Sequence, residues 1–311
     1  MNLEVFVLGT GGMMPLPHRF LTSVLVRRDG DLLLFDCGEG TQVALRSLNL
    51  RWKKISSIFI SHTHADHVTG LPGILMLSSQ VDRDEPLYIY GPPKIKDYIE
   101  SSKKVLEMYI NYPIIVKEIE DPTVASTIVT NENYSITTIP LDHTKPCVGY
   151  VLQEHNRPGE FFPKKAIELG VPVGPLFSRL QKGEDITLED GRVVTPSDVM
   201  GPPRKGRKFG FITDTKYHQE YSLFVKESDL LICEGMFTKE MEEDAAIKKH
   251  MSASQAAKIG KAAGVKKLGL IHYSPRYTNR ELKLLQKEAA EIYAPSFLCR
   301  DGMEIHIPLL D

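Results

Sequence analysis

Short apolar runs alternate along the chain with longer segments whose polarity repeats with a helical period. Several of the runs are flanked by Gly, Asp or Asn, the residues that favour turns, and this combination predicts short strands. The predicted strands cover residues 4–8, 23–26, 32–35, 57–61, 87–90, 114–117, 134–139, 148–153, 209–213, 230–233, 267–271 and 304–307. An Asp-Gly pair at positions 29 and 30 joins two of these runs into a predicted hairpin.

Helices are predicted between the strands, at residues 71–79, 93–108, 252–263 and 279–291. The last two open with capping residues, because Ser252 is followed three positions later by Gln255, and Thr278 by Glu281. Strands interleaved with helices indicate an α/β fold built from stacked layers. We find no internal repeat and no low-complexity tract in the sequence.

Ligand-type side chains concentrate directly after the apolar run at residues 58–61, in the motif His62-Thr63-His64-Ala65-Asp66-His67. In extended backbone His62 and His64 point to the same face, and Asp66 and His67 follow in the turn. Imidazole nitrogens and carboxylate oxygens are ligands for Zn²⁺, and four of them exceed the needs of one site with an open position. The motif therefore suggests two metal ions. The alternative interpretation is a solvated His-rich turn or a pair of core histidines.

Three more ligand-type residues follow short apolar strands elsewhere in the chain, namely His143, Asp214 and His272. A sheet brings the side chains at the ends of its strands to a shared edge, so we expect these three to meet the histidine motif there. Together they supply seven ligands. That set is sufficient for a dinuclear site with one bridging carboxylate and an open position for water.

The composition agrees with a soluble globular protein. The 311 residues are 42% hydrophobic and 25% charged, with a net charge of −2, which does not exclude RNA binding because local charge matters more. Length alone favours two domains, but candidate ligands between positions 62 and 272 favour one domain across residues 1–311. Four scattered cysteines, no signal-peptide pattern and no apolar stretch of ~20 residues predict a cytoplasmic protein without a membrane span.

Further segments resemble the ribonuclease Z family of the metallo-β-lactamase superfamily. They are Leu8-Gly9-Thr10-Gly11 with Pro15, residues 36–42 (DCGEGTQ), residues 70–73 (GLPG), residues 146–150 (PCVGY), residues 272–277 (HYSPRY), and His250 with Ser252, Gln255, Ala256 and Ala257. The resemblance extends from Leu3 to Ile307. It implies a four-layer αββα metallo-β-lactamase sandwich with a protruding flexible arm. It also implies the activity of the short, bacterial-type tRNA 3′-processing endonucleases.

The resemblance assigns a role to each candidate ligand. It implies two Zn²⁺ ions per subunit, with Mn²⁺ or Mg²⁺ as alternatives. One ion would be held by His62, His64 and His143, the other by Asp66, His67 and His272, and both by the bridging Asp214. Cleavage of precursor tRNA would leave a 3′-hydroxyl on the tRNA and a 5′-phosphate on the trailer.

The resemblance also implies catalytic groups beside the ions. Asp66 would orient or deprotonate the attacking water, and His250 would protonate the departing 3′-oxygen, with Glu234 as its carboxylate partner. The alternative for His250 is a charged cap near its two preceding lysines. The chain departs from the family at Ala65, where Gly is usual, at Cys233, where His is common, and at Met251, which separates His250 from the serine that follows.

Residues 157–208 are rich in Gly and Pro and carry ten basic and seven acidic residues, a local charge of +3. Alone, this pattern is equally typical of a solvated insertion. The resemblance implies a tRNA-binding arm whose core lies at about residues 159–182, in a homodimer where one subunit's arm serves the other's site. Its Gly-Pro motif would be Gly174-Pro175, and phosphate contacts would come from Lys164, Lys165, Arg179 and Lys182. Arg204, Lys205, Arg207 and Lys208 are equally well interpreted as solvated surface.

Other functions share parts of this pattern. A zinc β-lactamase with a Cys ligand has that residue where Asp214 stands, and a flavodiiron oxidoreductase needs an acidic residue at His64 and a flavin domain. A non-catalytic RNA-binding scaffold would have lost ligands. A dinucleotide site at residues 9–14 lacks its final Gly. The main alternative is a zinc phosphodiesterase acting on small or cyclic phosphodiesters, which could use the same ions without the arm.

Overall fold

The computed structural model describes residues 2–81 and 83–309. The chain divides into two compact units. The larger consists of residues 2–131, 135–153 and 208–308, and the smaller is formed mainly by residues 154–207. None of the helices in the described residues combines the length and the apolar character that a membrane crossing needs.

Two sheets form the centre of the larger unit, and each has seven strands within the described residues. The first has the order β16 (Glu304–His306), β1 (Leu3–Gly9), β2 (Ser23–Arg28), β3 (Asp31–Phe35), β4 (Ile55–Phe59), β5 (Leu87–Gly91) and β6 (Ile114–Glu118). The second has the order β15 (Ser296–Leu298), β14 (Leu268–Ile271), β13 (Leu230–Glu234), β12 (Lys208–Ile212), β9 (Cys147–Glu154), β8 (Tyr134–Leu141) and β7 (Thr127–Thr130). β3 to β6 are parallel, as are β12 to β15, whereas β16 pairs antiparallel with β1.

Aromatic side chains pack the two sheets against each other. The centre of the Phe35 ring in β3 lies 5.4 Å from the ring centre of Phe209 and 5.8 Å from that of Phe211, both in β12. The hydroxyl of Tyr150 in β9 donates to the carbonyl of Ile60, just after β4, at 2.6 Å. A strand that is buried on both faces has a nearly continuous apolar sequence. This explains why short apolar runs in the sequence marked the positions of these strands.

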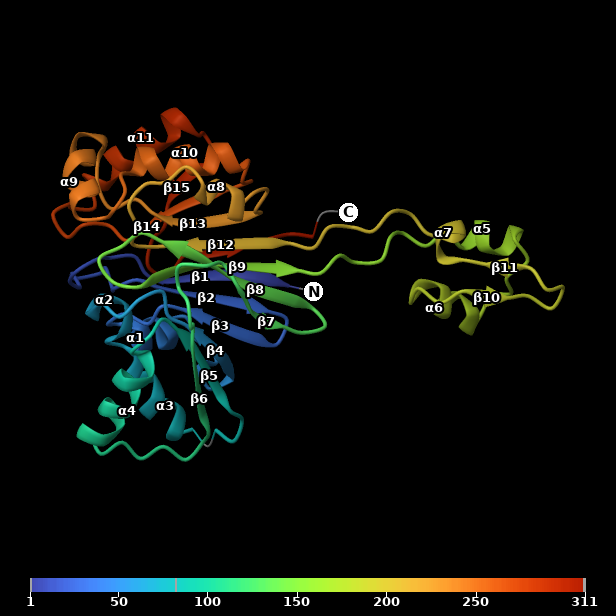
Figure 1. Ribbon diagram of the computed structural model, residues 1–311, viewed down its shortest axis with the longest axis horizontal. Coiled ribbons are helices and arrows are strands. Elements are labelled where there is room, and N and C mark those ends of the chain that lie inside the picture. The colour runs from blue at the N-terminus through green and yellow to red at the C-terminus, as the bar shows by residue number, and fades with distance from the viewer. Residues whose placement is uncertain (1, 82, 310–311) are drawn as a thin grey trace. The chain divides into compact units, whose positions relative to one another are not determined.

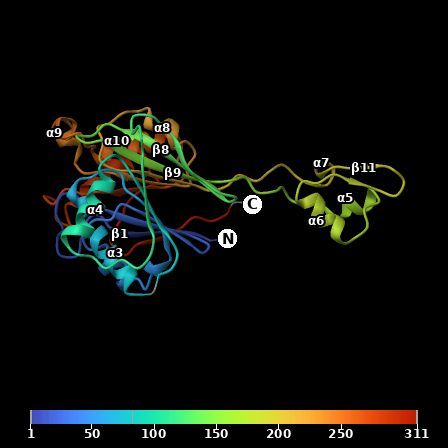
Figure 2. The same ribbon diagram turned by 60° about the horizontal axis from the view of Figure 1, so that its bottom comes forward.

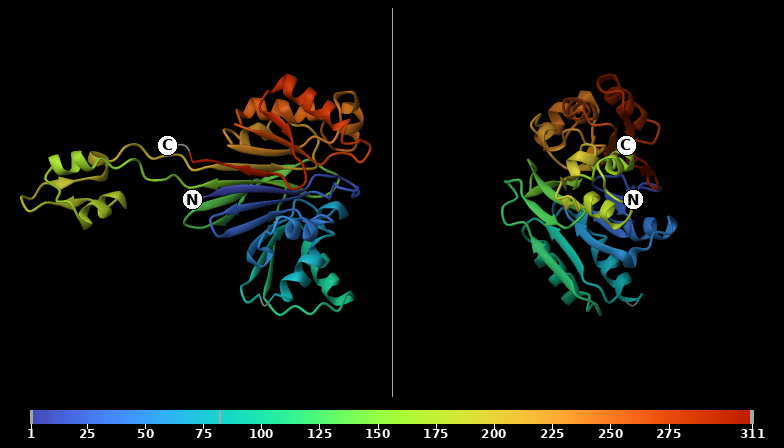
Figure 3. Two further views of the ribbon diagram at one scale, coloured as in Figure 1. Left: turned by 180° about the vertical axis from the view of Figure 1, so that it is seen from behind. Right: turned by 90° about the vertical axis from the view of Figure 1, so that its right-hand side faces the viewer.

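Helices cover the outer faces of the sheets (Figures 1, 2 and 3). The first sheet carries α1 (Thr41–Ser47), α2 (Ala65–Val68), α3 (Leu71–Ser79), α4 (Ile95–Val105) and the short 3₁₀ helix Trp52–Lys54. The second carries α8 (Tyr221–Phe224), α9 (Glu242–Ile247), α10 (Ala253–Ala263), α11 (Leu282–Ile292) and the 3₁₀ helix Lys239–Met241. Ile74 and Ile99 join the apolar cluster of the first sheet, and Ile259 and Leu285 that of the second. The expected αββα arrangement is confirmed.

The predicted strands all have counterparts, whereas the helix boundaries needed correction. Residues 93–108 form the shorter helix α4, and α11 begins at Leu282 because the Thr278–Glu281 pair closes a turn ahead of it. The capping box of Ser252 is confirmed, since its hydroxyl accepts the N–H of Gln255 at 3.1 Å. The hairpin is confirmed as well, by pairing between β2 and β3. β7, β15, α1, α8 and α9 were not predicted, and the helices among them have at most seven residues, too few for a clear helical period.

The smaller unit has regular structure of its own. It contains α5 (Pro163–Glu168), α6 (Pro175–Gln181), β10 (Ile186–Thr187), β11 (Val193–Val194) and α7 (Pro196–Val199). A small apolar cluster joins these elements and consists of Ala166, Val171, Leu180, Ile186, Val194 and Val199. The interpretation of Arg207 as solvated surface was wrong, because its guanidinium Nε lies 2.7 Å from Glu154 Oε2 and both side chains are buried. The Gly- and Pro-rich composition of this segment therefore gave no indication that it forms a packed unit.

Candidate metal centre

All seven predicted ligand residues lie just beyond the ends of strands. Four of them follow β4 in the first sheet, and the others follow β8, β12 and β14 in the second: His62, His64, Asp66 and His67, then His143, Asp214 and His272. Asp66 and His67 belong to the helix α2, which corrects the expectation that they lie in a turn. The ends of the two facing sheets thus bring residues from distant parts of the sequence into one cluster.

One group of donor atoms gathers around His64. Its Nδ1 lies 2.9 Å from His62 Nε2 and 3.1 Å from His143 Nε2. Asp214 Oδ2 completes the group, at 3.7 Å from the His62 nitrogen and 3.9 Å from the His143 nitrogen. Although β4 ends at Phe59, His62 and His64 still face the same point.

A second group uses the other oxygen of the same carboxylate. Asp214 Oδ1 lies 3.3 Å from His67 Nε2 and 3.2 Å from His272 Nε2. These two nitrogens are 3.3 Å apart, and Asp66 Oδ2 lies 3.3 Å from His272 Nε2. Asp214 therefore presents one oxygen to each group.

The donor atoms are spaced as ligands of metal ions are. Atoms bound tetrahedrally to Zn²⁺ at 2.0–2.1 Å lie about 3.3 Å from one another. The separations given above run from 2.9 to 3.9 Å and bracket that value, and all donor atoms of each group lie within 4.8 Å of one another. Imidazole and carboxylate, without thiolate, make up both donor sets, which suit Zn²⁺ and related divalent ions. The residues present therefore fit two ions that share Asp214.

The two groups differ in protonation. Burial raises the pKa of Asp214, but His272, His67 and His62 outweigh burial and hold the pKa well below its usual range. Burial lowers the pKa of His62, which keeps that imidazole neutral and able to bind a cation. Burial also lowers the pKa of His67, but Asp214, Asp36 and Asp66 outweigh burial and raise the pKa well above its usual range, so a metal ion would displace a proton from His67.

Asp36 holds the candidate ligand His67 and the neighbouring Ser61 in position, a role that the sequence analysis missed. Its Oδ2 accepts the Nδ1–H of His67 at 2.7 Å and the hydroxyl of Ser61 at 2.8 Å, and its Oδ1 accepts the Ser61 N–H at 2.7 Å. The bond to Nδ1 leaves Nε2 of His67 to face the centre. Asp36 directly follows β3. The same observation that singled out Asp214, a ligand-type residue just after a short apolar strand, could therefore have singled out Asp36 too.

Close backbone approaches complete the walls of the centre. A Cβ atom at Gly12 would lie 2.6 Å from the ring of His272, so only glycine fits there. The neighbouring Met13 donates its N–H to Asp66 Oδ2 at 2.7 Å. His272 itself has a backbone φ of +62°, in the left-handed region that residues with a Cβ atom rarely adopt. The loop at residues 12–13 therefore contacts two members of the second group, His272 and Asp66, directly.

His250 and Glu234 lie beside the cluster. His250 Nδ1 is 3.0 Å from Glu234 Oε2 and 3.9 Å from Asp214 Oδ2, and Glu234 Oε1 accepts the N–H of Thr215 at 2.6 Å. Burial lowers the pKa of His250, but the carboxylate of Glu234 outweighs burial and raises it to about 9. Cys233 and Met251, the two departures from the family here, are buried in the core and leave this pair intact.

The predicted tRNA contacts all lie in the smaller unit. Lys164 and Lys165 are exposed on α5, and Gly174 and Pro175 form the start of α6. Two further predicted contacts belong to the end of α6: Arg179, which pairs with Glu184 at 2.8 Å, and the exposed Lys182. Their side chains are exposed and so available to a ligand.

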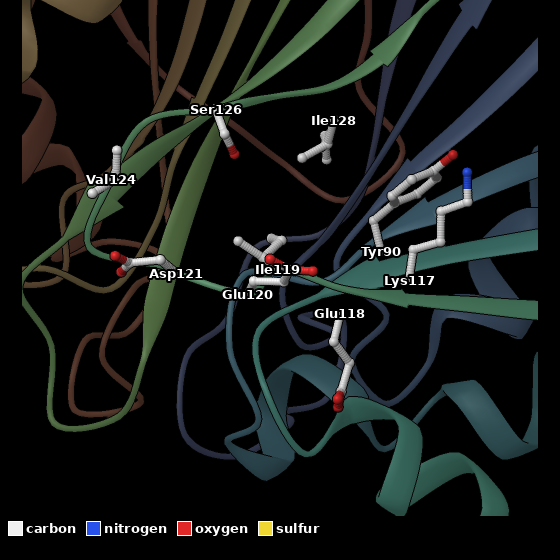
Figure 4. Close-up of a pocket in the computed structure, with 9 residues that line it drawn as sticks. All are labelled: Tyr90, Lys117, Glu118, Ile119, Glu120, Asp121, Val124, Ser126 and Ile128. Carbon is white, nitrogen blue, oxygen red and sulfur yellow. The ribbon is translucent and has the colours of Figure 1, made fainter.

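A separate pocket lies beside the edge strand β6 and has a volume of about 480 Å³ (Figure 4). Its lining is Tyr90, Lys117, Glu118, Ile119, Glu120, Asp121, Val124, Ser126 and Ile128. Lys117 Nζ lies 5.6 Å from the centre of the Tyr90 ring. None of these residues belongs to the metal-ligand groups, so this pocket is distinct from the candidate centre.

Comparisons with known proteins point to one family. Residues 3–155 match the family described as Anti-Pycsar protein Apyc1, and residues 180–273 match the family described as Beta-lactamase superfamily domain. The ribonuclease Z of Treponema denticola is 62% identical over 311 residues, with both chains fully covered. The ribonuclease Z of Borrelia duttonii is 43% identical over 98% of this chain and 97% of its own. The crystal structure of the short form of human tRNase Z superposes with a TM-score of 0.71 at 25% identity, and covers 98% of this chain and 99% of its own.

Proposed function

The chain belongs to the ribonuclease Z family, and from that premise we propose that it is a Zn²⁺-dependent endoribonuclease that removes the 3′ trailer from precursor tRNA. Membership makes the protein a metal-dependent endoribonuclease. The choice of Zn²⁺ follows from the imidazole-rich donor set. The products would be a tRNA ending in a 3′-hydroxyl and a trailer carrying a 5′-phosphate.

The position of Asp214 carries the proposal. Its two oxygens face two separate groups of imidazole and carboxylate donors at 3.2–3.9 Å. In the proposed assignment, His62, His64 and His143 hold one ion, and Asp66, His67 and His272 hold the other. Two divalent ions held in this way would neutralise charge on the scissile phosphodiester and lower the pKa of the attacking water.

Protein groups would manage the protons of the reaction. Asp66 would orient the attacking water or accept its proton, from a position fixed by the N–H of Met13. His250 directs Nδ1 at Glu234, so its Nε2 is the atom that would protonate the departing 3′-oxygen. Glu234 would stabilise the protonated imidazole and hold the ring in place.

We propose that residues 154–207 are the arm that binds the body of the tRNA. Lys164, Lys165, Arg179 and Lys182 would contact phosphates, and Gly174-Pro175 would shape the binding surface. Such contacts position a nucleic acid without reading its sequence. The enzyme would work as a homodimer in which the arm of one subunit holds the tRNA for the other's metal centre. It would act in the cytoplasm, where the four buried thiols would stay reduced.

Hydrolysis of small or cyclic phosphodiesters is the second candidate. It is favoured by the fact that every residue of the metal centre, with His250 and Glu234, belongs to the larger unit. A small diester could therefore reach the same chemistry without residues 154–207.

A cleavage assay separates the two candidates. The pure protein is incubated with a 5′-labelled precursor tRNA that carries a 3′ trailer, with and without a chelator, and the ends are mapped. A single cut after the discriminator nucleotide, lost on chelation and restored by Zn²⁺, is the expected result. Turnover of a small phosphodiester without any cut in the precursor would instead favour the second candidate.

A further inference from the structure

We propose that Lys249 is a positioning residue that fixes the metal ligand His143 and the acid His250 through a single backbone turn. The inference rests on the proposed function for the role of His250. It assigns a new part of the machinery to a residue that belongs neither to the ligand groups nor to the His250–Glu234 pair.

The turn is the end of helix α9. Lys248 is the C-cap residue, Lys249 donates its N–H to the carbonyl of Ala246 at 3.2 Å, and His250 donates its N–H to Ala245 at 2.8 Å. These two bonds form a Schellman motif, with Lys249 at the left-handed position and φ +56°. The backbone of His250 is therefore held by the end of the helix.

The carbonyl group of this same turn holds a metal ligand. The Nδ1–H of His143 donates to the carbonyl of Lys249 at 3.0 Å. A proton on Nδ1 leaves Nε2 of His143 without one, and Nε2 is the atom that faces His64 and Asp214. The direction of the carbonyl depends on the left-handed conformation of Lys249. A shift of this turn would move the imidazoles of His143 and His250 together.

The lysine side chain ties the turn to the loop that carries His143. Its ammonium donates to Asp142 Oδ1 at 2.7 Å and to the carbonyl of His143 at 3.3 Å. Gly and Asn are the usual residues at this position of a Schellman motif because a Cβ atom strains the left-handed conformation. The two ammonium hydrogen bonds offset that strain, which gives a physical reason for a lysine here.

Asp142 extends the connection to the loop of the bridging carboxylate. Its N–H donates to the hydroxyl of Thr215 at 3.0 Å, and its carbonyl accepts the N–H of Lys216 at 2.9 Å. Thr215 directly follows Asp214. Lys249 and Asp142 together therefore connect three loops, those of His143, Asp214 and His250.

Substitutions at Lys249 distinguish the contribution of its backbone carbonyl from that of its side-chain ammonium. Lys249→Gly and Lys249→Asn permit the left-handed turn and remove the ammonium, whereas the β-branched Lys249→Val opposes the turn. Lys248→Ala is the matched control, because it removes the neighbouring charge, and the Lys248 ammonium lies over the Phe237 ring, 5.7 Å from its centre. For each variant we would measure folding by circular dichroism, Zn²⁺ affinity by competition with a chelator, and kcat and KM.

The expected results differ between the variants. Lys249→Val lowers the Zn²⁺ affinity by about 10- to 100-fold, because the carbonyl no longer orients His143. Lys249→Gly and Lys249→Asn keep the carbonyl in place and have a smaller effect: they lower the Zn²⁺ affinity several-fold, and kcat on precursor tRNA and on bis(p-nitrophenyl) phosphate alike, because the lost ammonium hydrogen bonds held the loop of His143. Lys248→Ala matches wild type throughout. Asp142→Asn added to Lys249→Gly causes no further loss of Zn²⁺ affinity, since the ammonium contact is already absent and the other side-chain bond of Asp142 goes to the exposed His218.

The proposal is overturned if the Lys249 variants match Lys248→Ala in both Zn²⁺ affinity and kcat. Should Lys249→Val fail to fold, the Gly and Asn variants decide the outcome alone. A wild-type protein that leaves precursor tRNA uncut would refute the proposed function, and the Zn²⁺ affinity of Lys249→Val against Lys248→Ala would still test the turn.

Discussion

The metal centre and the smaller unit use charged side chains in opposite ways. In the metal centre the ionisable side chains are buried: His62, His67 and His272 are fully buried, and Asp214 is only 2% exposed. In residues 154–207 most charged side chains are exposed, and the buried cluster is apolar. Several of the exposed charges pair locally, as Arg192 does with Asp190 at 2.7 Å.

This difference predicts how each region tolerates change. A buried charge depends on the exact position of its partners, because removing one partner leaves the other charge uncompensated in a medium of low dielectric constant. An exposed cation acts through long-range attraction to phosphate, which many arrangements can supply and which salt screens. A single substitution in the metal centre should therefore cause a large loss of activity on every substrate. The smaller unit should fail gradually and only for substrates large enough to reach it.

Asp214→Ala tests this loss and has the largest expected effect. Loss of the shared carboxylate should remove ligands from both groups, so cleavage of precursor tRNA and of bis(p-nitrophenyl) phosphate should each fall by at least about 10³-fold. Bound Zn²⁺, measured by mass spectrometry, should fall with them. Wild-type turnover by a folded Asp214→Ala protein would contradict the proposed centre.

His250→Ala separates the role of the proposed general acid from that of the metal ligands. We expect the rate on precursor tRNA to fall by roughly 10²- to 10⁴-fold, because the departing 3′-oxygen loses its acid. Turnover of bis(p-nitrophenyl) phosphate and bound Zn²⁺ should change little, since p-nitrophenolate leaves without a proton. Loss of Zn²⁺ in this variant would show that His250 has a structural role instead.

Removal of the smaller unit tests the gradual, substrate-dependent failure. Arg157 and Arg204 exchange backbone hydrogen bonds of 2.8 and 2.9 Å, so replacing residues 158–203 by Asn-Gly should close a two-residue hairpin. We expect kcat/KM for precursor tRNA to fall about 10²-fold, through KM, because the predicted phosphate contacts are lost. Equal loss on bis(p-nitrophenyl) phosphate would mean that the unit supports the metal centre.

Charge reversal on α5 has the smallest expected effect. Lys164→Glu with Lys165→Glu should weaken binding of precursor tRNA several-fold at low salt, and should reduce the dependence of log Kd on log salt by roughly one to two units. Lys283→Glu with Lys287→Glu on α11 makes the same charge change in the larger unit and is the control. Equal effects of the two pairs would indicate a response to net charge rather than contacts on α5.

The clustering of the candidate metal ligands could be predicted because their positions are encoded in residue identity. A His or Asp that ends an apolar strand is visible in the sequence, and His143, Asp214 and His272 were found in this way. Asp36 obeys the same rule but was not assigned a role, since its oxygens face His67 and Ser61 rather than the centre. The strand-end pattern alone does not distinguish a ligand from the residue that orients one.

Lys249 and the smaller unit illustrate what the sequence analysis could not reach. Lys249 contributes a carbonyl, a group that every residue has, and its left-handed turn has no Gly or Asn to mark it. The smaller unit packs six short buried side chains around helices of four to seven residues, which are too brief for a helical period to be recognised. The burial of Arg207 against Glu154 depends on a partner 53 positions away.

The pairing of β16 with β1 has a consequence for how the protein is made. Glu4 lies opposite His306, so β1 is paired by a strand that is synthesised much later than β1 itself. His272, the last of the predicted ligands, is likewise synthesised long after His62. Because such distant pairings form only once both partners are present, a nascent chain can neither close its first sheet nor assemble its metal centre. The nuclease would therefore stay inactive until the residues up to His306 had emerged.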